Sequence, residues 1–114
     1  MFMALSTCFW RDDRLHEKMR SIIVERLRTF PAKYKQNNDY CLKMSCCGIR
    51  GSFIELKAIS DLTLSRIEIY TTESGIIPAN CIEPSHSIQT VRLWLKNENN
   101  CAALISNHYF NRFE

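Results

Sequence analysis

The chain has 114 residues, of which 46% are hydrophobic and 24% charged, so its length supports one domain with a single core. The formal net charge is only +3, and the basic residues are scattered along the chain rather than clustered, which argues against nucleic acid as a partner. No apolar run approaches the roughly 20 residues that a membrane span requires, so we expect no membrane insertion.

The first part of the sequence predicts two helices. Residues 1–10 are largely apolar and are compatible with a short helix. Asp12 and Asp13 then supply an N-cap and an acidic first turn for a second helix. The apolar residues of this second helix recur at steps of three and four up to Phe30, and we expect Pro31 to end it.

The middle of the sequence predicts a loop and then a third long helix. Residues 37–39 read as a loop, and residues 40–49 predict a short helical turn before the glycines that follow. Ser52 and Glu55 form a capping-box pattern, in which each residue satisfies a backbone N–H at the start of a helix. We therefore expect a helix over residues 52–62, with the apolar stripe Phe53, Leu56, Ile59 and Leu62.

The last part of the sequence changes to the period of a strand. Residues 66–70 alternate between polar and apolar side chains, which favours a half-buried strand. We expect a turn at residues 71–75 and a loose segment that contains Pro78 and Pro84. Later strands are predicted at residues 91–95 and 104–113, separated by a polar loop at 97–100. Helices first and strands later indicate the α+β class, in one domain over residues 1–114.

The chain has six cysteines: Cys8, Cys41, Cys46, Cys47, Cys81 and Cys101. They could pair as disulfides or hold zinc. The apolar opening of the chain is short and has no basic residue before it, so we do not interpret it as a secretion signal. We therefore expect free thiols in a reducing cytoplasmic or nuclear location. The spacing does not fit a zinc knuckle, and we expect no metal and no cofactor.

Several segments, in their order along the chain, match the motifs of one family. The segment Met1-Phe2-Met3-Ala4-Leu5-Ser6 resembles the residues that follow a nucleophilic Cys in the pattern Asp-Gly-x-Cys-Leu-Phe-Arg-Ala-Leu/Ile-Ser. The later matches are a His-x-x-x-Arg helix, a Trp-Gly-x-x-x-Glu-Leu-x-Ala-Leu/Ile-Ser helix start, two strands and a terminal histidine motif. The His-x-x-x-Arg helix lies at His16–Arg20, with its end at residues 30–34, and the helix start lies at residues 50–60. The two strands lie at residues 66–70 and 91–93, and the histidine motif is Asn107-His108-Tyr109.

With these motifs the chain resembles the ovarian-tumour (OTU) family of cysteine peptidases. The resemblance implies a small three-layer domain, α/β/α-like, with helices first and then a small sheet. It also implies deubiquitinase chemistry, in which a thiolate attacks the isopeptide carbonyl and an imidazole assists it. The expected partners are ubiquitin or polyubiquitin conjugates.

The histidine motif supplies the site residues that the resemblance implies. His108 would be the general base, and Asn107 and Tyr109 would contact the substrate. The family has an orienting Asp or Asn two residues after the histidine, where this chain has Phe110. Asn111 is then the candidate for that role. His16 is interpreted as a structural or solvated residue of its helix, and the loop residue His86 has no evident catalytic partner.

Besides Phe110, two further departures from the family pattern bear on activity. The nucleophile position falls just before Met1, so we expect a domain truncated after the catalytic Cys position. Cys8 cannot replace that Cys, because it lies two helical turns away, roughly 12 Å at 1.5 Å per residue. Arg50 stands where the family has Trp. We therefore expect this chain to be inactive by itself. It is then either part of a longer peptidase or a non-catalytic, ubiquitin-binding pseudoenzyme or regulatory module.

Overall fold

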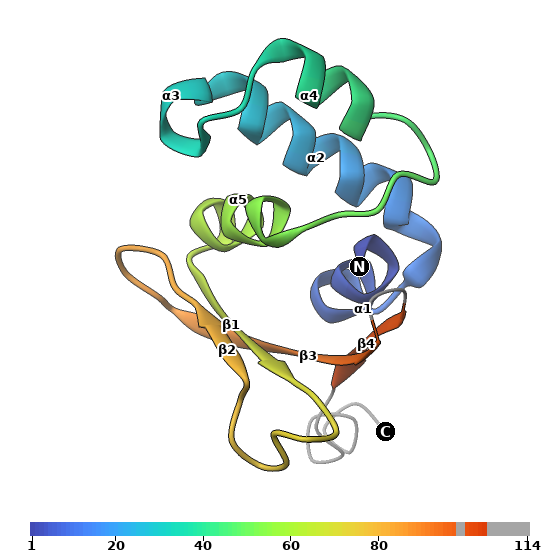
Figure 1. The fold of residues 1–114 in the computed structure, drawn as a ribbon, viewed down its shortest axis with the longest axis vertical. Coiled ribbons are helices and arrows are strands. Elements are labelled where there is room, and N and C mark those ends of the chain that lie inside the picture. Colours follow the sequence, from blue (N-terminus) through green and yellow to red (C-terminus); the bar gives the residue numbers. More distant parts are fainter. Residues whose placement is uncertain (98–99, 105–114) are drawn as a thin grey trace.

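The computed structural model describes residues 1–97 and 100–104. Helices form the first half of this part of the chain, and strands form the second half (Figure 1). The helical elements are α1 (Phe2–Trp10), the short 3-10 turn η1 (Asp13–Leu15), α2 (His16–Thr29), α3 (Pro31–Tyr34), α4 (Asn38–Met44) and α5 (Phe53–Thr63). The strands are β1 (Ser65–Tyr70), β2 (Asn80–Ile82), β3 (Gln89–Asn97) and β4 (Asn100–Leu104).

The strands form one mixed sheet in the order β2-β1-β3-β4. The two central strands, β1 and β3, are parallel, with Ile67 opposite Val91 and Ile69 opposite Leu93. The outer strands are antiparallel to their neighbours. Because opposite residues of paired strands point to the same face, the parallel centre presents a continuous apolar row to the helices.

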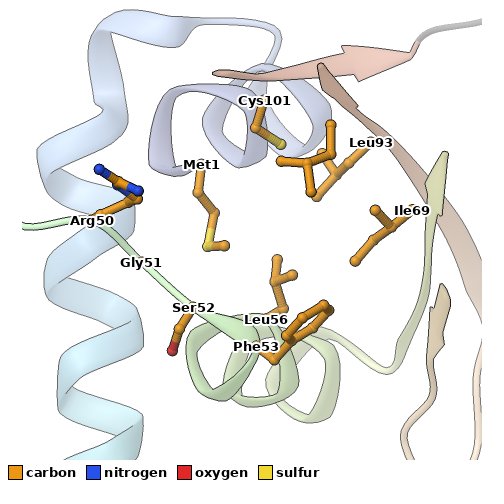
Figure 2. A pocket seen from close by; sticks show the side chains of 10 residues that line it. Met1, Arg50, Gly51, Ser52, Phe53, Leu56, Ile69, Leu93 and Cys101 are labelled. Carbon is orange, nitrogen blue, oxygen red and sulfur yellow. The ribbon is translucent and has the colours of Figure 1, made fainter. Parts of the chain in front are cut away.

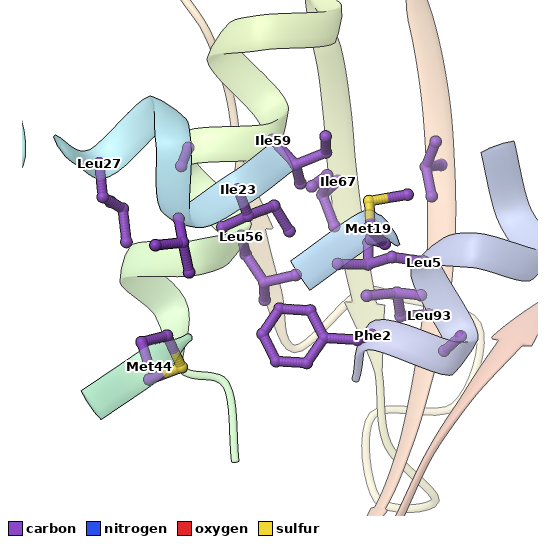
Figure 3. Close-up of a cluster of buried hydrophobic side chains, with 14 of the residues drawn as sticks. Phe2, Leu5, Met19, Ile23, Leu27, Met44, Leu56, Ile59, Ile67 and Leu93 are labelled. Atoms are coloured by element: carbon purple, nitrogen blue, oxygen red, sulfur yellow. The ribbon is translucent and has the colours of Figure 1, made fainter. Parts of the chain in front are cut away.

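The helices are stacked in two layers over one face of the sheet (Figure 1). Helix α5 packs on β1, and α1 packs on β3 and β4. Helix α2 lies above them, in contact with α1 and α5, and α4 packs against α2. Between these layers lies a core to which both helices and strands contribute, and Figure 3 shows part of it. Its fully buried members include Leu5, Ile23, Leu27 and Ile67, and each such side chain stabilises the fold by about 1.5–3 kcal/mol.

Local side-chain bonds explain where several helices begin. Asp12 accepts a hydrogen bond from the backbone N–H of Arg14 and so caps η1, which leads into α2. At α4 the capping residue is Asn37, whose side chain accepts from the N–H of Tyr40. The capping box of Ser52 is formed at α5. These bonds satisfy N–H groups that have no partner within the helix.

The α+β class, with helices first and a small sheet after them, is confirmed. The predicted helices at 1–10 and 52–62 and the strands at 66–70 and 91–95 are all present. The short turn predicted within 40–49 is helix α4, which begins at Asn38 and so includes part of the predicted loop at 37–39. Pro31 follows the end of α2 and is also the first residue of α3. Proline is favoured there because the backbone N–H at the first helical position has no partner within the helix. The predicted α/β/α arrangement would place helices on both faces of the sheet. In the described residues, both helical layers lie on the same face.

Two details of the predicted sheet differ from the structure. Strand β2 lies within the segment that the sequence suggested was loose. The strand after the polar loop is β4, which begins at Asn100. It therefore starts before the predicted range of 104–113, and most of that range lies outside the described residues.

The outer face of the sheet, away from the helices, carries a polar cluster. Glu68 of β1 accepts hydrogen bonds from Arg66 at 3.0 Å, from Arg92 at 2.9 Å and from the Tyr70 hydroxyl at 2.8 Å. Arg66 also donates to the sulfur of Cys81 on β2. We call these five residues the outer cluster. They tie β2, β1 and β3 together on the face opposite the core.

Candidate functional site

An apolar pocket opens where the start of α1 meets one end of the sheet (Figure 2). Its volume is about 300 Å³, at the lower end of the range for ligand-binding pockets. The pocket lies against the carboxyl ends of β1 and β3, the beginning of β4 and the segment that enters α5. Its lining residues are Met1, Arg50, Gly51, Ser52, Phe53, Leu56, Ile69, Leu93, Leu95 and Cys101.

The pocket has an apolar wall and one charged side chain at its rim. Ile69 and Leu93 point into it from the sheet, and Leu56 closes it from α5 (Figure 2). Phe53 leaves 54% of its surface exposed at the mouth. Arg50 lies at the opposite rim, and in Figure 2 the side chain of Met1 stands between Arg50 and the strand residues. The pocket can therefore hold an extended apolar group with a charge at one end.

A buried carboxylate fixes the segment that carries Arg50. Glu55 is fully buried. Its Oε1 accepts from the backbone N–H of Ser52 at 2.7 Å and from the Ser52 hydroxyl at 2.8 Å. Its Oε2 accepts from the Tyr40 hydroxyl at 2.7 Å. Burial, together with the bond to Glu55, raises the pKa of Tyr40 to about 12, so its hydroxyl keeps the proton it donates. This bonding connects α4 to the pocket wall.

Gly51 allows this segment to approach the start of α1. A Cβ at position 51 would lie 2.7 Å from Sδ of Met1 and 3.1 Å from Cζ of Phe2. Both distances are shorter than ordinary van der Waals contacts. A side chain at this position would displace the flexible end of Met1, which lines the pocket, and press on the ring of Phe2. The glycine therefore favours the close packing seen here.

The arginine of the His-x-x-x-Arg motif has a structural role beside the pocket. Arg20 of α2 is nearly buried, donates to the carbonyl of Met44 at 2.9 Å, and stacks on the ring of Phe2 at 4.2 Å. Its Nε makes no hydrogen bond, and the carboxylate of Glu17 is 3.7 Å away. His16 pairs with the same carboxylate at 3.1 Å, in keeping with a structural or solvated histidine. Arg20 thus holds the start of α1 against α2 and α4.

The two cysteines on α1 and β4 do not form an activated nucleophile. Cys8 donates its S–H to the carbonyl of Arg92 at 3.7 Å, and burial raises the pKa of Cys8 to about 12. Burial also raises the pKa of Cys101, which lines the pocket. Thiolates are the reactive form, so both thiols are poor nucleophiles near neutral pH. The prediction that Cys8 is not a catalytic nucleophile agrees with this environment.

The predicted catalytic segment lies outside the described residues. Asn107, His108, Tyr109, Phe110 and Asn111 all follow Leu104, the last described residue, so their roles stay predictions. The structure does show the direction of the strand that leads to them.

Strand β4 runs away from the pocket over its described residues. It begins beside the pocket, where Cys101 pairs with Leu95, and its end at Leu104 pairs with Arg92. At about 3.4 Å per residue the strand has moved roughly 10 Å from the pocket at that point. The exposed His86 lies in the connection between β2 and β3 and does not line the pocket.

Sequence reasoning did not identify most of the pocket. It singled out Arg50, Gly51 and the capping pair, but not the apolar wall that strands β1, β3 and β4 contribute. Alternation along the strands marks Ile69 and Leu93 as inward-facing, but it does not show which end of the sheet is left open. Among the described residues, no three His, Cys, Asp or Glu side chains lie close enough to hold a metal ion. No described helix is long and apolar enough to cross a membrane.

Comparison with solved structures identifies a similar fold. The chain superposes on the OTU domain of OTUD1 with a TM-score of 0.77, over 92% of this chain and 77% of that one, at 16% sequence identity. No family model matches the sequence, and no curated protein matches it either. At this identity the similarity establishes an OTU-like fold.

Proposed function

We propose that this OTU-like domain is directed at ubiquitin, and that this chain binds ubiquitin or polyubiquitin conjugates without cleaving them. The observation that carries the proposal is the apolar pocket at the start of α1. The sequence resemblance independently locates the ubiquitin-cleaving centre of the family at the start of this helix. A cytoplasmic or nuclear location stays a prediction.

The chemistry of the described residues favours binding over hydrolysis. A cysteine peptidase needs an ionised thiol paired with an imidazole. Cys101 lines the pocket and Cys8 lies towards the other end of α1, and both thiols have raised pKa values. We therefore expect no measurable isopeptide hydrolysis from this chain by the family's route.

Titration of the labelled protein with ubiquitin, followed by NMR, tests the binding proposal. We expect saturable shifts at the pocket residues Leu56, Ile69 and Leu93. Phe53→Ala should weaken binding, because Phe53 stands at the pocket mouth. The matched control is Phe30→Ala, since Phe30 is also a partly exposed aromatic (41%) but does not line this pocket. The absence of shifts at millimolar ubiquitin would overturn the proposal.

Peptidase activity is the second candidate, because the pocket lies at the start of α1, next to the position that the resemblance gives to the nucleophile. A ubiquitin probe with a C-terminal electrophile tests it on this chain and on a longer chain that carries an Asp-Gly-x-Cys segment before Met1. Labelling of the longer chain alone, abolished by His108→Ala, would support a peptidase. A folded longer chain that stays unlabelled would rule it out.

A further inference from the structure

A groove runs along the side of α2 that faces away from the core, with a volume of about 430 Å³. The residues of α2 that line it include Lys18, Ser21, Ile22, Glu25 and Arg26. Leu62, near the end of α5, borders the groove. It lies about 14 Å along α5 from Phe53, which lines the apolar pocket, at 1.5 Å per residue. The groove shares no lining residue with that pocket, so this α2 groove is a separate surface.

The α2 groove combines apolar side chains with charges of both signs. Ile22 is half-buried, and Phe30 and Leu62 are exposed in the same lining. Exposed apolar patches with polar rims are typical of protein–protein contacts. Lys18 and Glu25 are both exposed, and they lie on one side of α2 with Ile22, because residues three and four apart on a helix are neighbours. A partner for this surface therefore needs an apolar helix face with complementary charges.

A second copy of α2 meets this description. When two identical helices pack antiparallel about a two-fold axis, residues equally far from the crossing point face each other, and each such contact occurs twice. With the crossing between Ser21 and Ile22, Lys18 of each copy faces Glu25 of the other. Ser21 then faces Ile22, so a small side chain receives a large one. A crossing at Ile22 itself would instead place Lys18 opposite Arg26, and these like charges would repel.

The interactions that Lys18 and Glu25 make within one copy are weak. The Lys18 ammonium lies 5.6 Å from the centre of the Trp10 ring. Glu25 pairs with Arg28 at 3.2 Å, but the two side chains are 66% and 44% exposed. Exposed ion pairs of this kind contribute little stability. Both Lys18 and Glu25 can therefore turn towards an opposite charge on another molecule.

We propose that the chain forms a two-fold dimer through the α2 groove, with Lys18 of each copy paired with Glu25 of the other. The apolar centre of the contact is Ile22 of both copies, and Phe30 and Leu62 extend it at the border of the groove. This inference goes beyond the proposed function. None of the residues that line the apolar pocket takes part in the contact, so each copy retains its own pocket.

Charge reversal tests this pairing. Sedimentation equilibrium of the full chain should show a dimer whose fraction rises with protein concentration. Lys18→Glu and Glu25→Lys should each weaken self-association about tenfold, because each substitution turns two attractions into two repulsions. An equimolar mixture of the two variants should restore the dimer, since both charge contacts between the unlike copies then join a lysine to a glutamate.

Lys43→Glu and Glu73→Lys are the matched controls, because Lys43 and Glu73 are exposed and neither lines the α2 groove. Both controls should dimerise like the wild-type protein, and thermal melts confirm that every variant folds. A wild-type chain that stays monomeric up to about 1 mM would overturn the inference. A dimer that both charge reversals leave intact, or a mixture that fails to associate, would overturn it as well. Binding of ubiquitin is measured separately, so failure of the dimer leaves the proposed function standing.

Discussion

The two faces of the sheet have different chemistry, although neighbouring residues of the same strands form them. On the inner face Ile67 is fully buried against the helices. The adjacent Glu68 points to the outer face and accepts hydrogen bonds from two arginines and a tyrosine. Burial of apolar surface contributes far more stability than partly solvated ion pairs do. We therefore expect the inner face to determine whether the chain folds, and the outer cluster to adjust how tightly the strands are held.

The largest effect is expected from Ile67→Ala. It leaves a cavity under α5 and should cost about 2–5 kcal/mol of unfolding free energy, as large-to-small core substitutions do. Chemical denaturation followed by circular dichroism measures the loss. Ile67→Val is the control and should cost about 0.5–1.5 kcal/mol. A loss below that of Ile67→Val would show that the site relaxes without a cavity.

The thiols on the two faces should differ in alkylation rate, with Cys81 reacting faster than Cys8. Cys8 faces the sheet from α1, and with its pKa at about 12 only about one molecule in ten thousand is a thiolate at pH 8. Cys81 is exposed on the edge strand β2. Mass spectrometry of the native protein treated with iodoacetamide should show Cys81 modified before Cys8. Equal rates in denaturant serve as the control, and equal rates in the native protein would contradict the prediction.

Glu68→Gln should have a smaller effect, about 1 kcal/mol. The Glu68 side chain is only 13% exposed, but Arg66 and Arg92 are 33% and 52% exposed, so solvent screens much of the attraction. Denaturation at pH 7 measures the loss. Glu68→Asp retains the charge on a shorter side chain and serves as the comparison. A glutamine variant as stable as the wild-type protein would show that the outer cluster adds no stability.

Acid should remove the stabilisation that the Glu68 carboxylate contributes. Burial acts to raise the pKa of Glu68, but hydrogen bonds from Tyr70 and Arg66, together with the Arg92 charge, outweigh it and lower the pKa. The stabilisation from the Glu68 carboxylate is then fully present above the pKa of Glu68 in the unfolded chain, about 4.3. It is lost as the pH falls through the lower pKa of Glu68 in the folded protein. The stability difference between the wild-type protein and Glu68→Gln should therefore shrink below about pH 4. A difference that stays constant down to pH 3 would contradict this.

Cys81→Ala should have the smallest effect. Its sulfur accepts one bond from Arg66 at the exposed edge of the sheet. Surface substitutions of this kind usually change stability by less than about 0.5 kcal/mol. Thermal unfolding should give nearly the same midpoint as the wild-type protein. A large drop would mean that β2 is held mainly through this contact.

The sequence was most informative where local rules decide the structure. The capping box of Ser52 and Glu55 predicts the start of α5, and the alternation around Ile67 predicts β1. Strand β2 could not be predicted, because its three residues are not fully buried and so carry no core-facing pattern. Its position comes from its pairing with β1.

The candidate site was less predictable than the fold. The resemblance drew attention to Arg50 and Gly51, but the pocket depends on contacts between the start of α1 and strands that follow much later in the chain. Such long-range contacts leave no signal at fixed spacing in a single sequence. The proposed roles around His108 rest on the resemblance alone.

The packing of α1 on β3 and β4 has a consequence for how the protein is made. The Cys8 to Arg92 contact spans 84 positions, so α1 finds its partners on the sheet only after β3 has been synthesised. Until then the apolar face of α1 has no sheet to cover it, although α2 is already available. Closing so long a loop is slow. We expect translation to release a helical intermediate that is open to chaperones until β3 and β4 cover α1 and complete the pocket.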